Sequence, residues 1–250
     1  MTAAPTTLSA SSTVKPAGKS FYVSMAVMAM LFSVAAFGPS ITHTAGRSGP
    51  LTAMLAAHGI VFFAWLLVFL TQSILARIGR LDLHRRLGAL SVILASMMVF
   101  LGYYTTIAMG RRGFDLSGDL AVGSDPLAAM AFPLLDILMF AVLFAAAYLY
   151  RHRSAIHKRL MLLAVFGALM PAPVAHLTGH FAFLHDKGFL TPVIIAAFLA
   201  ACGIHDRITL HRLHPVSLWI ALTIFILDNL CFAVVMPSAA WHTLAARLIQ

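Results

Sequence analysis

The stretch that decides the fold is residues 51–76, which read LTAMLAAHGIVFFAWLLVFLTQSILA. It contains no Asp, Glu, Lys or Arg, and it is longer than the roughly 20 apolar residues that a helix needs to cross a bilayer. The chain has no ten-residue run that alternates apolar and polar side chains, as a membrane β-barrel requires. This stretch therefore predicts a transmembrane α-helix.

The composition extends this prediction to the whole chain. Of its 250 residues, 61% are hydrophobic and 10% are charged, whereas soluble domains carry about 25% charged residues. This excludes a soluble globular enzyme and a disordered protein. The net charge of +9 comes from Lys and Arg in short gaps between apolar runs, with no basic stripe among aromatic residues. The pattern argues against nucleic-acid binding.

Six more segments resemble the first, so we expect an all-α, polytopic membrane helix bundle of about seven transmembrane helices. The predicted spans are residues 21–41, 51–76, 87–109, 127–150, 160–180, 188–204 and 216–236. We expect residues 1–20 to be a disordered cytoplasmic lead, 21–237 the transmembrane domain and 238–250 a short amphipathic tail. The sequence leaves open whether the first helix is retained or cleaved as a signal peptide.

Lys and Arg are distributed unequally between the two sides of these spans. Twelve lie in the amino-terminal segment or in the connections after the second, fourth and sixth spans, and five lie on the other side. Cytoplasmic loops are enriched in Lys and Arg. We therefore expect a multi-pass protein of the bacterial inner membrane, with a cytoplasmic amino terminus and a periplasmic carboxyl terminus.

Three of the connections expected in the cytoplasm place a His, mostly followed by cations, where a helix begins. The residues are His84, Arg85 and Arg86, then His157, Lys158 and Arg159, and in a degenerate third copy His214. Cations at a helix start oppose the helix dipole, so we expect them to bind anionic lipid headgroups. Two alternatives remain, namely simple snorkelling anchors and a haem held between His84 and His157.

The helix-start motifs also carry a resemblance. HRRLG at 84–88, HKRLMLL at 157–163 and LHPVSLW at 213–219, taken together, resemble an uncharacterised family of bacterial seven-span membrane proteins. The resemblance covers about residues 57–248, including an ending similar to the family's short amphipathic ending. It implies a fold and a membrane location, but no reaction.

Polar side chains recur inside the apolar spans, mostly in the half expected to face the periplasm. Ionisable groups in a bilayer are costly and indicate a functional site. The candidates for a cofactor or metal site are His58, Asp136, His176, His180 and Asp228. The residues expected to support them are Trp65, Gln72 and Asn229.

Spacing favours a metal or cofactor among these candidates. His176 and His180 are four residues apart, so both lie on one helix face, from which two imidazoles can bind one metal ion. Pro171 and Pro173 predict a helix break that frees backbone carbonyls. We expect His58 to face His176, with the two imidazoles within about 5 Å for a metal site. In the alternative, His58 only bonds a neighbouring helix.

Three functions remain open at this point. The first is a redox protein that holds a b-type haem or a transition metal in this site. The second is a proton-coupled carrier or membrane-complex subunit that uses Asp136 and Asp228. The third is an intramembrane metal-dependent hydrolase. The expected partners are the bilayer and its anionic lipids, and the sequence identifies no substrate or protein partner.

Overall fold

Seven helices are long and apolar enough to cross a membrane in the computed structural model, which describes residues 18–42, 52–113, 125–180 and 190–250. They are Ser20–Pro39, Ala53–Arg77, Leu81–Arg112, Pro126–Leu149, Ser154–Gly179, Leu190–Leu210 and Pro215–Val235. The described ranges contain no strand. A helix satisfies its backbone groups internally, which hydrocarbon demands. The predicted all-α bundle is confirmed, and the chain is a multi-pass membrane protein.

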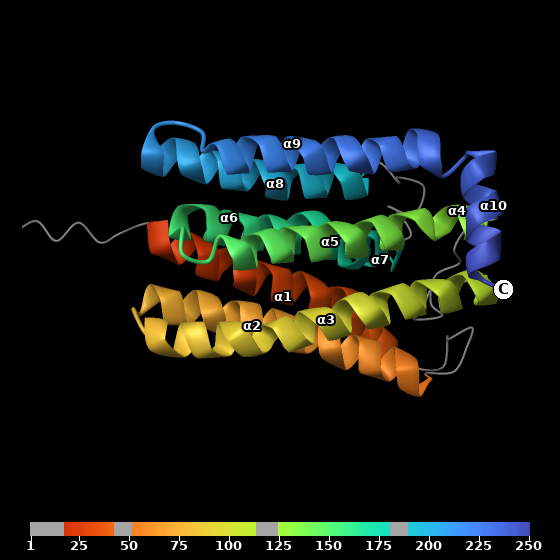
Figure 1. The fold of residues 1–250 in the computed structure, drawn as a ribbon, viewed down its shortest axis with the longest axis horizontal. Helices are drawn as coiled ribbons and strands as arrows, with labels where there is room; N and C mark the ends of the chain where they lie inside the picture. Colours follow the sequence, from red (N-terminus) through yellow and green to blue (C-terminus); the bar gives the residue numbers. More distant parts are fainter. Residues whose placement is uncertain (1–17, 43–51, 114–124, 181–189) are drawn as a thin grey trace, which may run out of the picture.

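The helices run side by side along the bundle (Figure 1). The first three spans are α1 (Gly18–Thr42), α2 (Ala53–Arg77) and α3 (Leu81–Arg112); the fourth is α4 (Pro126–Ala129) with α5 (Ala131–Leu149). The fifth joins α6 (Ser154–Leu163), η2 (Ala164–Leu169) and α7 (Pro171–His180). Then come α8 (Leu190–Leu210), α9 (Pro215–Leu230), η3 (Cys231–Val235) and α10 (Ala239–Leu248).

The fifth span lies at the centre of the bundle. It packs against α1, α5, α8 and α9, and 67% of its apolar window is buried, against at most 33% in any other span. Gly167 permits the close approach of α9, because a Cβ there would lie 2.6 Å from Cδ1 of Ile224. The neighbouring Val165 and Phe166 are fully buried. The other spans therefore assemble around this one.

Two spans end in or contain a π-helix. In the fifth span, η2 closes with a bond from the N–H of Met170 to the carbonyl of Val165, 3.0 Å, directly before Pro171. Pro171 and Pro173 lack an N–H and cannot donate to a regular ladder. The ladder changes register here, although the span continues through both prolines as one helix, Ser154–Gly179. In the seventh span, η3 carries the equivalent bond from Met236 to Cys231, 2.9 Å. π-Helical turns are rare and frequently occur at functional sites.

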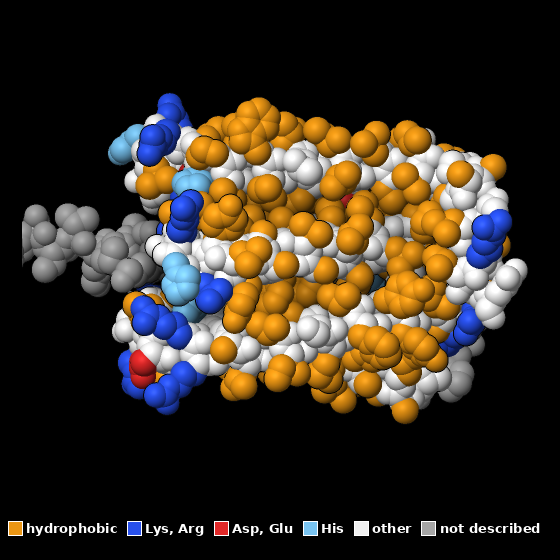
Figure 2. Space-filling view, viewed as in Figure 1, with side chains coloured by type: hydrophobic (Ala, Val, Ile, Leu, Met, Phe, Trp, Pro, Cys, Tyr) orange, Lys and Arg blue, Asp and Glu red, His pale blue; other side chains and the backbone are white. Residues whose placement is uncertain are grey.

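The surface is divided into three bands (Figure 2). Lys and Arg gather at the two ends, and hydrophobic side chains cover the length between them. We call the end with connections 78–80, 150–153 and 211–214 the basic end. Helix α10 crosses the opposite end of the bundle, nearly at right angles to the spans (Figure 1).

Three contacts hold α10 against that opposite end. The indole N–H of Trp241 donates to the carbonyl of Leu127, 2.8 Å, and Arg111 Nε donates to the carbonyl of Ile249, 2.7 Å. Ala245, on the inner face of α10, is fully buried. The expected amphipathic tail is thus a helix that is bonded to α3 and α4.

A further contact, between His242 and Asp125, predicts that α10 docks in a pH-dependent way. His242 Nε2 lies 2.6 Å from Asp125 Oδ2. The bond to this carboxylate raises the pKa of His242 above its ordinary 6.5. The bond from the N–H of Ala128, with that from His242, lowers the pKa of Asp125 below 3.8. The ion pair therefore forms between the lowered pKa of Asp125 and the raised pKa of His242, and it is lost as the pH rises through the pKa of His242.

We expect the hydrogen-exchange protection of α10, corrected for intrinsic rates, to be severalfold greater at about pH 5.5 than at about pH 8.5. The His242→Gln protein cannot form the ion pair, so its protection should be the same at both pH values. A pH difference of equal size in His242→Gln would contradict this role of the pair.

Candidate functional site

His58 is bonded to the neighbouring helix of its own hairpin. Its ring stacks on Phe62 with 4.1 Å between ring centres, and its Nδ1 lies 3.2 Å from Oγ1 of Thr105 on α3. The Thr105 hydroxyl donates to the carbonyl of Leu101, 2.7 Å, so the His58 Nδ1–H donates to Thr105. In this arrangement His58 bonds a neighbouring helix, as the alternative interpretation of this residue expects, and its partner is the hydroxyl of Thr105.

His176 belongs to a different neighbourhood. It is buried on α7, with its ring centre 4.7 Å from that of Phe37 on α1. The side chain of His180 lies outside the described residues. Within the described part of the chain, no group of three or more His, Cys, Asp or Glu side chains could hold a metal ion. That His58 faces His176 across a metal or haem stays a prediction.

Asp136 and Asp228 are the two site candidates whose carboxyl groups lack hydrogen-bond partners among the described residues. Asp136 lies near the middle of the fourth span, and Asp228 lies one turn before η3. Both are half-buried, and each has a buried Oδ1 with no hydrogen-bond partner among the described residues. The two carboxyls lie on elements that pack together, since α5 contacts both α9 and η3. An unpaired buried polar group costs about 1–3 kcal/mol, which is tolerated where function requires it.

The three supporting residues lie apart from such a site. Trp65 is buried and packs edge-on against Phe140, with its Nε1 unpaired among the described residues. Gln72 lies near the basic end, where its Nε2 donates to the carbonyl of His84, 3.0 Å. Asn229 is exposed and bonds a carbonyl one turn earlier in α9. None of the three contacts His58, His176, Asp136 or Asp228 in these bonds.

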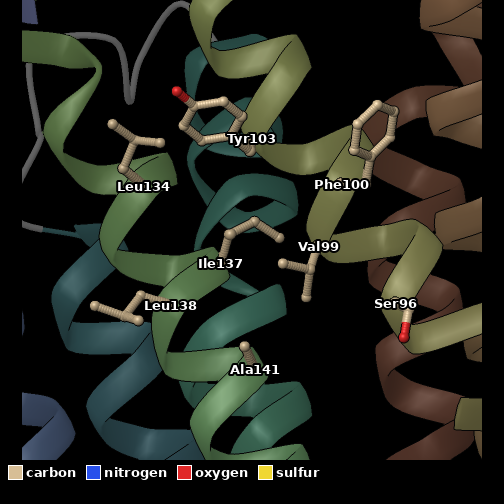
Figure 3. Close-up of a pocket in the computed structure, with 8 residues that line it drawn as sticks. All are labelled: Ser96, Val99, Phe100, Tyr103, Leu134, Ile137, Leu138 and Ala141. Carbon is tan, nitrogen blue, oxygen red and sulfur yellow. The ribbon is translucent and has the colours of Figure 1, made fainter. Parts of the chain in front are cut away.

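A shallow groove of about 480 Å³ opens between α3 and α5 (Figure 3). Its lining is Ser96, Val99, Phe100, Tyr103, Leu134, Ile137, Leu138 and Ala141. Two hydroxyls are the only polar side-chain groups in this set, and Phe100 and Leu138 are exposed on the bundle's surface. The groove can accommodate hydrocarbon, and it offers no acid, base or metal ligand.

A buried ion pair near the basic end was not foreseen. Arg159 on α6 is 2% exposed, Asp206 on α8 is fully buried, and their side chains form a paired contact. Arg159 Nε donates to Asp206 Oδ2 at 3.0 Å, and the Ser217 hydroxyl of α9 donates to the same carboxylate. The Cys202 thiol lies 3.4 Å from the Ser217 hydroxyl. This network joins the fifth, sixth and seventh spans.

The position of Arg159 differs from the interfacial position expected for it. The guanidinium points into the bundle, whereas Arg85, Arg86 and Lys158 are exposed. Asp206 was missed because the sixth span was expected to end at residue 204, and α8 continues to Leu210. The signal available in the sequence was an acidic residue, Asp206, one position before Arg207 at the end of an apolar span.

The remaining interfacial candidates are His214, His84 and His157. His214 begins α9, and its Nδ1 accepts a bond from the N–H of Val216, 3.2 Å. Burial, followed by the charge of Arg159, lowers the pKa of His214 below 6.5. The rings of His84 and His157 lie next to each other, with 6.2 Å between ring centres. The repeated motif therefore brings two imidazoles together at the basic end.

The fold and these groups define a seven-helix, multi-pass membrane protein with one satisfied and one unsatisfied buried polar cluster. Comparison of the chain with protein-family models, with curated proteins and with solved structures gives no match.

The ion pair predicts a large loss of stability when one partner is removed. Asp206→Ala leaves Arg159 charged, buried and unpaired, so we expect the free energy of unfolding to fall by about 3–5 kcal/mol. Thermal unfolding in detergent, followed by the reactivity of the two buried cysteine thiols, measures the change.

The matched control is Asp82→Ala. Its carboxylate lies 3.6 Å from Arg80 in a pair whose side chains are 61% and 58% exposed, so removal should change stability by about 1 kcal/mol or less. Equal effects of Asp82→Ala and Asp206→Ala would contradict the role given to the buried pair.

Proposed function

We propose that this protein binds and releases protons at Asp136 and Asp228 within the membrane, as a proton-coupled carrier or as the proton-binding subunit of a membrane complex. We further propose that it lies in the bacterial inner membrane with its basic end in the cytoplasm, as members of the family that its helix-start motifs resemble would.

The observation that carries the proposal is a pair of buried carboxyl oxygens that have no hydrogen-bond partner within the described ranges. Asp136 and Asp228 come from helices that are distant in sequence but pack together. Two carboxylates on packed helices in an apolar medium repel each other, and an isolated ion there is very costly. A proton on one carboxyl removes the repulsion and supplies a donor. Proton uptake is therefore the chemistry that suits this pair best.

The backbone around the pair supports a site that can change shape. Helix α5, which carries Asp136, packs against both π-helices, η2 and η3. Each π-helix has a hydrogen-bond ladder displaced from the regular register. A small rearrangement of either π-helix can change the distance between the two carboxyls. That distance sets their repulsion, and so how readily one of them takes up a proton.

The other two functions have less support in the described geometry. A hydrolase or a metal-dependent redox centre needs several ligands around one ion, and the described residues bring no set of three or more together. A haem needs His58 to face His176, whereas His58 bonds Thr105 on α3 and His176 packs on Phe37 of α1. His58 already uses one ring nitrogen on Thr105. The proposal therefore places function at the carboxyl pair rather than at His58 and His176.

The orientation rests on the positions of the cations. Arg85, Arg86 and Lys158 are exposed at the basic end, where a cation near an anionic leaflet contributes about 1 kcal/mol. The positive-inside rule places such loops in the cytoplasm. Anionic lipid headgroups are accordingly the partners that we propose for these three side chains.

Reporter fusions test the orientation. A reporter that is active only in the periplasm should be active when fused after Gln250 and inactive when fused after Arg153, because these sites lie at opposite ends of the bundle. The reverse pattern would overturn the orientation, and activity at both sites would contradict the arrangement of the spans.

Carbodiimide labelling tests the proton site. Dicyclohexylcarbodiimide partitions into bilayers and modifies carboxyl groups in their protonated form. We expect protein reconstituted in liposomes to be modified at Asp136 or Asp228, and the yield, read by peptide mass spectrometry, to fall at least threefold from about pH 5 to about pH 9. Asp136→Asn should abolish labelling at position 136, and Asp228→Asn labelling at position 228.

Asp206 is the matched control within the same protein. It is more deeply buried but paired with Arg159, so it should stay unlabelled at every pH. Labelling of Asp136 or Asp228 that does not change with pH would mean a permanently protonated, structural carboxyl and would refute proton release. Absence of labelling at both would refute the proton site.

A further inference from the structure

We infer that His84 and His157 form a binding site for a two-coordinate metal ion, Cu(I), at the basic end of the bundle. This site is separate from the carboxyl pair and does not depend on the proposed proton chemistry. It rests on the contacts of each ring, on the distance between the rings and on the charges around them.

The Nδ1 of each ring is engaged with a backbone carbonyl. His84 Nδ1 lies 3.3 Å from the carbonyl oxygen of Gln72, and His157 Nδ1 lies 2.8 Å from that of Ala147. A carbonyl can only accept, so the proton of each neutral ring is on Nδ1 and the lone pair is on Nε2. This is the tautomer that metal-binding histidines adopt, with a backbone carbonyl orienting the ring.

The same arrangement arises twice from one repeated motif. His84 follows α2 and reaches back to it, and His157 follows α5 and reaches back to it in the same manner. The third copy differs, because Nδ1 of His214 accepts a bond from Val216 instead. Among the described residues, neither the Nε2 of His84 nor the Nε2 of His157 has a hydrogen-bond partner. Two oriented lone pairs are thus left at one end of the bundle.

The spacing of the rings selects the coordination geometry. A metal–nitrogen bond is about 2.0 Å, and the ring centre lies roughly 1 Å beyond the nitrogen. Two imidazoles on opposite sides of one ion therefore have centres roughly 6 Å apart, and at a tetrahedral angle roughly 5 Å apart. The observed separation is 6.2 Å, with the ring planes at 89°. This favours a nearly linear pair of ligands.

The nature of the ion follows from this geometry and from the surrounding charge. Zn²⁺ takes four ligands in structural sites and three protein ligands plus water in catalytic ones, whereas Cu(I) is stable with two nitrogen ligands in a line, and imidazole suits copper. Arg85 and Lys158 directly follow the two histidines. A monovalent ion is repelled by these cations less than a divalent one.

Competition with a chromophoric Cu(I) chelator, such as bicinchoninate, tests the site in purified full-length protein under anaerobic, reducing conditions. We expect one Cu(I) per chain in the wild type. His84→Ala and His157→Ala should each lower the affinity at least about tenfold, and the double variant should lose little more, because both ligands hold the same ion.

The controls separate this site from other copper ligands. His152→Ala removes an exposed imidazole from the connection next to His157, and Cys202→Ser removes a buried thiol; both should bind copper as the wild type does. Thermal unfolding of each variant, measured alongside, must match the wild type for a loss of copper to count.

Four results would overturn the inference. The first is copper binding that survives in the folded double variant. The second is copper binding that is lost in Cys202→Ser. The third is a preference for Zn²⁺ over Cu(I) at the same pair. The fourth is a haem absorbance band that disappears with either histidine, which would assign the two imidazoles to a haem instead.

Discussion

The burial of the fifth span is the constraint on which the rest of the bundle depends. Because α6, η2 and α7 are surrounded by other helices rather than by lipid, this span must be apolar and closely packed on every side. Gly167 permits that packing against α9, and the Arg159–Asp206 pair joins one end of the span to α8. Each of the other spans packs against protein with one face only, and its remaining surface is exposed to hydrocarbon.

Two buried polar clusters in the same bundle show opposite solutions to one physical problem. The Arg159–Asp206 pair is neutral overall and satisfied by hydrogen bonds, as a structural element must be. Asp136 and Asp228 carry the same sign of charge, and in the part of the chain that the structure describes each leaves one oxygen without a partner. Such a cluster is stable only with a proton or a ligand, which is why the second cluster carries the proposed function.

The spans could be predicted from the sequence because hydropathy and the length of a bilayer crossing are local properties. An irregularity near Pro171 was also predictable, because the missing N–H of proline is a local property. The partners of His58, Arg159 and Asp206 were not, because they depend on which helices adjoin and on how each helix is rotated. The expected end of the sixth span at residue 204 was too early, since pairing with Arg159 allows α8 to retain an acidic residue.

The order of the two partners along the chain has a consequence for biosynthesis. Arg159 precedes Asp206 by 47 residues, so the ribosome releases the cation first. Before Asp206 is synthesised, the long side chain of Arg159 near its helix end can extend toward the headgroups. The short side chain of an aspartate cannot do so. The carboxylate therefore enters the membrane when its counter-ion is already present, and vectorial synthesis favours assembly of the last hairpin onto a finished scaffold.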